Sequence, residues 1–190
     1  VETSPVVNYN VVVLDQNLKY NSSITFVNTN VLRMGSTYDA NVTGLLFTLR
    51  DKKNNYAISG NSSLSQRFLE NQKDIGHQYS LNFQKTNGNW QWYAFYNEES
   101  FNYNPNDLGY LYSPNERTTK GSLTYNNFKP KRIFNRWNVN VNATYTRLQK
   151  PDAFNFLYFN ASFFAMTRKF LAYNVSASYE PIGTNDYFEP

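Results

Sequence analysis

Side chains alternate in kind along much of the chain, which is the pattern of β-strands that face different surroundings on their two sides. Residues 136–148 are the clearest case. Their apolar positions are Trp137, Val139, Val141, Ala143 and Tyr145, and their intervening polar positions are Asn138, Asn140, Asn142, Thr144 and Thr146. Successive side chains of a strand point to opposite faces, so this pattern predicts one apolar face and one neutral polar face.

The same alternation predicts about ten strands. They cover residues 7–14, 18–28, 41–50, 56–68, 77–85, 90–98, 119–128, 136–148, 154–166 and 171–179. Each segment is long enough to cross a membrane when tilted. A helix-based membrane protein is excluded, because no apolar run approaches the ~18 residues that a spanning helix needs.

The predicted connections alternate in length, which indicates an up-and-down antiparallel meander. Short connections are expected at 15–17, 51–55, 86–89, 129–132 and 167–170, and longer ones at 29–40, 69–76, 100–118 and 149–153. Tight turns at one rim and long loops at the other are typical of an antiparallel up-and-down transmembrane β-barrel, with the short turns periplasmic. A soluble barrel with one loop-rich end is the alternative.

Composition supports an all-β chain. The 190 residues include 29 Asn, 16 Tyr and 15 Phe, a mixture that favours strands and turns over helices. The 41% hydrophobic content is too high for a disordered tail, and the absence of cysteine excludes disulfide scaffolds and thiolate chemistry. The chain begins at Val1 without an initiator Met or a signal peptide, so we expect residues 1–190 to be a single barrel segment of a longer protein.

Charge placement favours the membrane barrel over the soluble one. Almost every carboxylate falls in a predicted connection or at a strand end, and the strand middles are nearly uncharged. Soluble barrels keep Lys and Glu on the water-facing side of their strands, whereas Lys or Arg at mid-bilayer costs about 2 to 4 kcal/mol. Trp90, Trp92, Trp137 and Tyr145 lie near strand ends, as interfacial aromatic girdles require.

Candidate catalytic groups are few. The single histidine, His77, has no G-x-S-x-G turn to accompany it, and adjacent Glu98 and Glu99 should point to opposite faces of a strand. We therefore expect no catalytic residue, metal site or cofactor. Nucleic acid is not an expected partner either: the net charge is +4, but the cations, such as those of the 129–132 turn, are scattered over turns.

Residues 100–118 form the predicted connection with the most distinctive sequence, and two interpretations of it stay open. The residues with the composition of a sugar-binding surface are Tyr103, Asn106, Asp107, Tyr110 and Tyr112. A loop of this length also commonly folds back on itself or into a barrel as a plug. In either case Asn138, Asn140, Asn142 and Thr144 are expected to face the lumen.

Four segments resemble one family. They are NYNVVVLDQNLKYNSSITFVNTNVLR (8–33), YDANVTGLLFTLRDKKNNYAISG (38–60), FNYNPNDLGYL (101–111) and NDYFEP (185–190). Together they resemble the uncharacterised C-terminal β-barrel domain of large Bacteroidota outer-membrane proteins that carry an N-terminal family 9 carbohydrate-binding-like module. The resemblance covers essentially the whole chain and implies a bacterial outer-membrane location.

Two functions follow as expectations. The first is a non-enzymatic outer-membrane barrel component serving passage, anchoring or assembly of envelope proteins, with the lipid bilayer and other outer-membrane or periplasmic proteins as partners. The second is a carbohydrate-binding β domain of a surface glycan-handling protein or hydrolase, with a glycan as partner.

Overall fold

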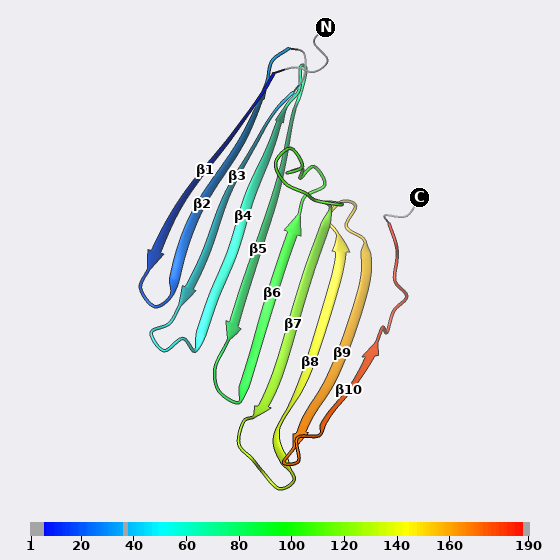
Figure 1. Cartoon of the computed structure of the whole chain (residues 1–190). Helices are drawn as coiled ribbons and strands as arrows, with labels where there is room; N and C mark the ends of the chain where they lie inside the picture. The colour runs from blue at the N-terminus through cyan, green and yellow to red at the C-terminus, as the bar shows by residue number, and fades with distance from the viewer. Residues whose placement is uncertain (1–5, 36–37, 188–190) are drawn as a thin grey trace.

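The chain forms one antiparallel sheet of ten strands, seen in a computed structural model that describes residues 6–35 and 38–187 (Figure 1). The strands are β1 (Val7–Leu18), β2 (Ser22–Arg33), β3 (Asp39–Arg50), β4 (Tyr56–Phe68), β5 (Lys73–Lys85), β6 (Trp90–Glu99), β7 (Glu116–Asn127), β8 (Phe134–Leu148), β9 (Phe154–Thr167) and β10 (Ala172–Tyr179). Each strand pairs with the next in sequence. No helix in this part of the chain is long and apolar enough to span a membrane.

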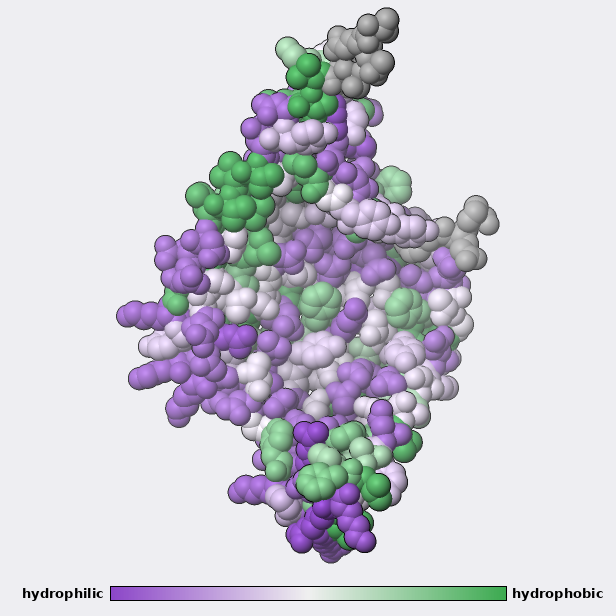
Figure 2. Space-filling model, in the orientation of Figure 1, coloured by the Kyte–Doolittle hydropathy of each residue, from purple (hydrophilic) through white to green (hydrophobic). Residues whose placement is uncertain are grey.

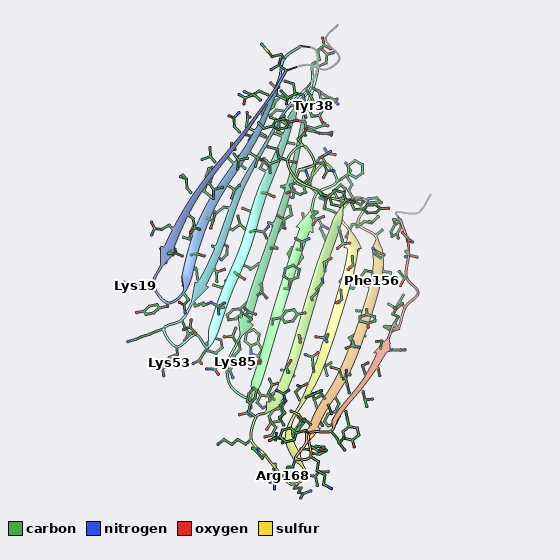
Figure 3. The ribbon with its side chains drawn as sticks, viewed as in Figure 1. Lys19, Tyr38, Lys53, Lys85, Phe156 and Arg168 are labelled. Carbon is green, nitrogen blue, oxygen red and sulfur yellow. The ribbon has the colours of Figure 1, made fainter. Side chains whose placement is uncertain are left out.

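The sequential order confirms the predicted meander. The connections 19–21, 51–55, 86–89, 128–133 and 168–171 all lie at one rim, which we call the turn rim. The connections 34–38, 69–72, 100–115 and 149–153 lie at the other, the loop rim. Figure 3 marks the two rims: Lys19, Lys53, Lys85 and Arg168 lie at the turn rim, and Tyr38 lies at the loop rim.

Two predicted connections were misplaced. Residues 15–17 belong to β1, where Asp15 pairs with Thr25 and accepts a hydrogen bond from its hydroxyl at 2.5 Å. The turn lies three residues later, with Tyr20 and Asn21 at φ of 62° and 56°. Likewise β2 continues to Arg33, so the long connection predicted at 29–40 is a short one.

The sheet is open. β1 and β10 are its two edges and do not pair with each other, so the described residues form an open sheet and not a closed barrel. A single layer has little core, so few side chains are buried and many large apolar ones are exposed. The ends of β1–β5 at the loop rim reach beyond those of β6–β9 in Figure 1, which gives the sheet a marked stagger.

The two faces of the sheet differ in chemistry around β8. The alternation predicted for β8 is confirmed: Asn140 lies opposite Thr124 and Ser162, and Val141 lies opposite Leu123 and Ala161 on the other side. We call the face of Asn140 the loop face, because the 100–115 loop lies over it, and the face of Val141 the girdle face. Figure 2 shows a largely hydrophilic or neutral surface, with hydrophobic side chains gathered over β1 and β2 and near the lowest turns.

Candidate functional site

The 100–115 loop folds across the loop face at the loop rim. It leaves β6 through paired bonds between Ser100 and His77: the Ser100 nitrogen donates to the His77 carbonyl at 2.9 Å, and the His77 nitrogen donates to the Ser100 hydroxyl at 2.8 Å. The Tyr103 hydroxyl lies 2.6 Å from that of Ser63, and the Asn104 nitrogen donates to the Ser65 hydroxyl at 3.0 Å. The loop is therefore fastened to β4 and β5.

Tyr103 is the most deeply placed aromatic of this loop. It is 9% exposed, and its burial raises the pKa of its phenol above the usual range, while the hydrogen bond to Ser63 acts against that rise. Gly76 of β5 makes room for it, because a β-carbon there would lie 2.3 Å from the Tyr103 nitrogen. Tyr103 is an anchor of the loop.

Asp107 ties the far end of the loop to β2 and β3. Its carboxylate forms an ion pair with Arg33 and accepts a hydrogen bond from the Tyr38 hydroxyl at 3.0 Å. Its side chain is 8% exposed and that of Arg33 is 16% exposed. The Arg33 guanidinium also lies 4.5 Å from the Tyr38 ring centroid, and burial together with the bond to Asp107 raises the pKa of Tyr38.

The remaining loop residues singled out from sequence divide into two kinds. Asn106 shapes the loop itself, since its side-chain amide donates to the Leu111 carbonyl at 3.1 Å and accepts from the Leu111 nitrogen at 2.6 Å. Tyr110 and Tyr112 are 84% and 82% exposed. Three of the five residues thus hold the loop in place and two present rings to the surroundings.

A hollow of 230 Å³ lies under the loop beside Arg67 of β4. Its lining residues include Phe101, Asn102, Asn104 and Tyr112. The Arg67 guanidinium pairs with Asp74 at 2.7 Å, but its buried Nε has no hydrogen-bond partner. The hollow can hold a small polar ligand such as one sugar ring.

The four predicted lumen positions all lie on the loop face by register. The Asn140 amide donates to Ser122 at 2.8 Å and to Thr124 at 2.6 Å, and the Asn142 amide donates to Asn140. Asn138 lies opposite Asn126, and Thr144 lies opposite Lys120. Neutral hydrogen-bonding groups therefore continue across the middle of β7 and β8, with Lys120 as a charged residue beside them.

The girdle face carries aromatic rings near the turn rim. The ring centroids of Trp90 and Tyr125 lie 4.9 Å apart, those of Tyr125 and Trp137 lie 5.3 Å apart, and those of Trp137 and Phe163 lie 6.4 Å apart. These contacts join β6 to β9. We call this chain of rings the lower band.

A second set of aromatic residues, the upper band, lies on the same face near the loop rim. The Tyr79 and Tyr96 centroids lie 5.9 Å apart, and those of Tyr145 and Phe154 lie 6.0 Å apart. Between the two bands the girdle face of β5–β10 carries small or aliphatic side chains and three rings. The rings are Phe83, Trp92 and Phe159, and the centroids of Phe83 and Trp92 lie 5.0 Å apart. The other residues are Leu81, Ala94, Gly121, Leu123, Val139, Val141, Ala143, Ala161, Val175 and Ala177.

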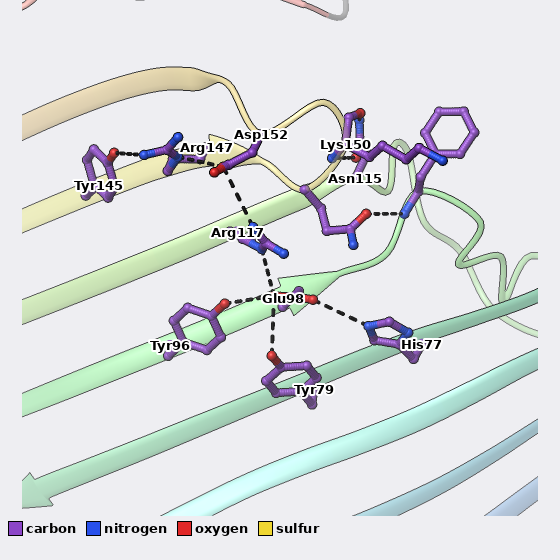
Figure 4. Close-up of polar contacts among 12 residues, drawn as sticks. His77, Tyr79, Tyr96, Glu98, Asn115, Arg117, Tyr145, Arg147, Lys150 and Asp152 are labelled. Atoms are coloured by element: carbon purple, nitrogen blue, oxygen red, sulfur yellow. Dashed lines mark hydrogen bonds and ion pairs between the residues drawn. The ribbon is translucent and has the colours of Figure 1, made fainter.

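A polar cluster lies among the upper band (Figure 4). Glu98 accepts from the Tyr96 hydroxyl at 2.8 Å and from Arg117 Nε at 2.8 Å, and His77 Nε2 lies 3.4 Å away. Asp152 continues the cluster by pairing with Arg147 at 2.8 Å and with Arg117 at 3.7 Å. Sequence reasoning missed this cluster, because its members come from four strands and a connection.

The structure separates the three carboxylates that the sequence singled out, Glu98, Glu99 and Asp107. Glu98 lies on the girdle face, whereas Glu99 lies on the loop face opposite Glu116, as the strand alternation predicted. Asp107 is engaged by Arg33 on the loop face. Within residues 6–35 and 38–187, no three His, Asp or Glu side chains gather closely enough to hold a metal ion.

Comparison with known proteins identifies the family. The sequence model of the family described as "Domain of unknown function (DUF5916)" matches residues 1–190. The chain belongs to this family. No curated protein and no solved structure matches it.

Proposed function

We propose that this DUF5916 domain forms part of the wall of an outer-membrane β-barrel that serves passage, anchoring or assembly of envelope proteins, without catalysis of its own. The observation that carries the proposal is the girdle face, where two aromatic bands flank an apolar zone. Transmembrane barrels place aromatic girdles at both membrane interfaces and an apolar band about 25 Å tall between them.

The spacing of the two bands fits a bilayer. Tyr145 of the upper band and Trp137 of the lower band lie on the same strand, and eight residues of strand span about 26 Å. A strand tilt of about 40° reduces this span to roughly 20 Å along the membrane normal. The aromatic rings would then lie at the two edges of the apolar band.

Exposure of the zone between the bands supports the same role. Leu81, Leu123 and Val141 are 46%, 47% and 47% exposed, and Val175 of β10 is 65% exposed. Exposed apolar side chains spread over six strands form a large patch, which soluble monomers rarely tolerate. Contact with lipid would remove this surface from water.

The girdle face of β2 and β3 carries polar residues in the part of the sheet that extends farthest toward the loop rim (Figure 1). Asn28 of β2 donates to Asn41 at 3.2 Å and to Thr43 at 2.8 Å, in the half of β2 and β3 that is nearer the loop rim. Nearer the turn rim the same face carries Phe26 and Leu45. Strands β1–β5 would therefore extend out of the membrane on the loop side, where polar groups are tolerated.

On this proposal, further strands complete the wall at the two open edges of the sheet. Unpaired backbone groups cannot face lipid, so β1 and β10 each require a neighbouring strand in a membrane. The resemblance to the C-terminal barrel domain of large Bacteroidota outer-membrane proteins supports a longer protein as the source of these strands.

Extraction and gel migration test the proposal in the intact protein. We expect it in the outer-membrane fraction, resistant to alkaline and high-salt washes, released by detergent, and shifted in gel migration when the sample is left unheated. Release by alkali or salt without detergent would contradict the proposal.

A carbohydrate-binding domain is the second candidate, favoured by the exposed Tyr110 and Tyr112 and by the hollow beside Arg67. Rings stack on sugar faces, and the amides of Asn102 and Asn104 can bond hydroxyls. Binding of an oligosaccharide panel that is lost in Tyr110→Ala/Tyr112→Ala would support this candidate. Equal binding by the variant, or none by either protein, would reject it for this loop.

A further inference from the structure

The turn rim gathers most of the positive charge of the chain. Eleven Lys and Arg residues lie in its turns or within four strand residues of them, against two carboxylates, Asp15 and Asp51. The eleven are Lys19, Arg50, Lys52, Lys53, Lys85, Lys129, Lys131, Arg132, Arg136, Arg168 and Lys169. In sequence these cations are scattered over more than a hundred residues. The meander brings the turns that carry them to one edge of the sheet.

The loop rim has the opposite balance. By the same definition it holds six cations and ten carboxylates in the described part of the chain. The cations are Arg33, Arg67, Lys73, Arg117, Arg147 and Lys150, and the carboxylates are Asp39, Glu70, Asp74, Glu98, Glu99, Asp107, Glu116, Asp152, Glu180 and Asp186. The charge of the domain is thus separated along the strands.

The cations of the two rims also differ in their partners. Every ion pair found among residues 6–35 and 38–187 lies toward the loop rim. None of the eleven turn-rim cations has a carboxylate of the described residues within 4.0 Å. Asp15 accepts from Thr25, and Asp51 accepts from the Tyr56 and Lys53 nitrogens, so both carboxylates serve the local fold.

The turn-rim cations are accessible and spread along the whole edge. Nine of the eleven are exposed, and Arg50 and Lys85 are half-buried. Figure 3 places Lys19, Lys53, Lys85 and Arg168 along the turn rim from the β1–β2 hairpin to the β9–β10 hairpin. Figure 2 shows hydrophilic side chains projecting at the turns of β1–β4. Like charges held in a row repel one another unless an anionic surface faces them.

We propose that the turn rim binds the anionic headgroups of phospholipids in the membrane leaflet that it borders. This inference rests on the proposed membrane location. The row of cations lies beside the lower aromatic band, which is where headgroup phosphates lie when such rings occupy the interface. Basic clusters at a membrane surface attract anionic lipids with about 1 kcal/mol per Lys or Arg. A linear array suits a plane of headgroups, whereas a single acidic ligand would use one part of the rim.

Lipid selectivity of the reconstituted intact protein tests this inference. The protein is inserted into phosphatidylcholine vesicles carrying a trace of either spin-labelled phosphatidylglycerol or spin-labelled phosphatidylcholine, and the immobilised fraction of each label is measured. We expect phosphatidylglycerol to be preferred roughly fivefold or more at low salt. The preference should fall steeply as salt rises, because headgroup charges are screened.

Two matched variants remove two positive charges from opposite rims. Lys52→Gln/Lys53→Gln changes an exposed turn of the turn rim, and Lys73→Gln/Lys150→Gln changes two loop-rim lysines that form no ion pair with a carboxylate. We expect the first to lower the phosphatidylglycerol preference at least twofold and the second to leave it unchanged. Adding Lys129→Gln/Lys131→Gln to the first should lower it further.

The outcomes separate this inference from the proposed function. A protein that inserts into the vesicles but shows no phosphatidylglycerol preference overturns the inference, leaves the barrel intact and points to an acidic protein or polymer as the partner of the rim. Equal loss in both variants also overturns it, since net charge alone would then explain the effect. Failure to insert into any vesicle overturns the proposed function and the inference together.

Discussion

The backbone of Tyr103 lies directly against Gly76, so that a β-carbon on Gly76 would lie 2.3 Å from both the nitrogen and the α-carbon of Tyr103. Only glycine permits this approach. The contact fixes the loop on β5, and the hydroxyl contact between Tyr103 and Ser63 fixes it on β4. A close backbone approach thus accompanies the hydrogen bonds that attach the 100–115 loop to the sheet.

Gly76→Ala should detach the loop at this point. The added methyl group cannot be accommodated without a shift of the Tyr103 backbone, with a cost of about 1 to 3 kcal/mol. We expect faster amide hydrogen exchange across residues 100–115. Gly121→Ala is the control, because the nearest atom to its β-carbon, the Tyr93 carbonyl oxygen, is 4.0 Å away. Loop exchange that rises equally in both variants would argue against the anchor.

Asp107→Asn should loosen the other end of the loop. The substitution removes the charge that faces Arg33 in a site where the two side chains are 8% and 16% exposed, and leaving Arg33 without its partner should cost about 2 kcal/mol. Asp152→Asn removes the same charge from a side chain that is 57% exposed and should cost less than about 1 kcal/mol. Proteolysis of the loop in each variant measures the difference. Equal susceptibility would mean that Asp107 does not hold the loop.

The loop should open in alkali. Burial raises the pKa of Tyr103 in the closed form, so the open form ionises first, near the ordinary tyrosine value of about 10. Closure is therefore fully favoured below that pH and weakens as the pH rises above it. Hydrogen exchange or proteolysis of the loop between neutral and alkaline pH measures this change. In Tyr103→Phe, loop exchange and proteolysis should depend much less on pH above about 10. If the variant keeps the wild-type pH dependence, a group other than Tyr103 causes the opening.

The intact protein should show no hydrolysis of glycan or peptide panels that depends on this domain. Glu98, Glu99 and Asp107 lie on different faces or are engaged by arginine, so no two of them flank a common substrate position. Turnover that disappears in Glu98→Gln/Glu99→Gln/Asp107→Asn would place an active site here. Because that triple variant can also unfold, single Glu99→Gln, which breaks no ion pair, serves as a second test.

The strands and their faces could largely be predicted from sequence. In β8 the strict alternation around Val141 and Asn140 predicts apolar residues on one face and polar residues on the other, and the structure has this arrangement. The first turn was predicted at the wrong residues because 15–17 have a turn-forming composition. Pairing of Asp15 with Thr25 extends β1 past these residues. The turn that follows includes Tyr20 at a φ of 62°, which tyrosine rarely adopts.

The tertiary features could not be predicted in this way. The contact of Asp107 with Arg33 joins residues 74 positions apart, and nothing in the loop indicates its partner. The cluster around Glu98 and the charge of the turn rim likewise require the order of the strands in space. The alternation of apolar and polar residues within a segment predicts a strand and its two faces. The charge of each rim and the contacts of the loop depend instead on how the strands are ordered in space.

The pair of substitutions Val141→Lys and Asn140→Lys tests the membrane wall most directly, because the two residues are adjacent in β8 and lie on opposite faces. Both exchange a neutral residue for the same cation. The measurement is the fraction of intact protein that reaches the outer membrane in the form whose gel migration changes on heating. We predict that Val141→Lys lowers this fraction strongly, given a mid-bilayer cost of about 2 to 4 kcal/mol, and that Asn140→Lys leaves it near the wild-type level. Equal loss in both variants, or none in either, would contradict a wall with one lipid face and one wet face.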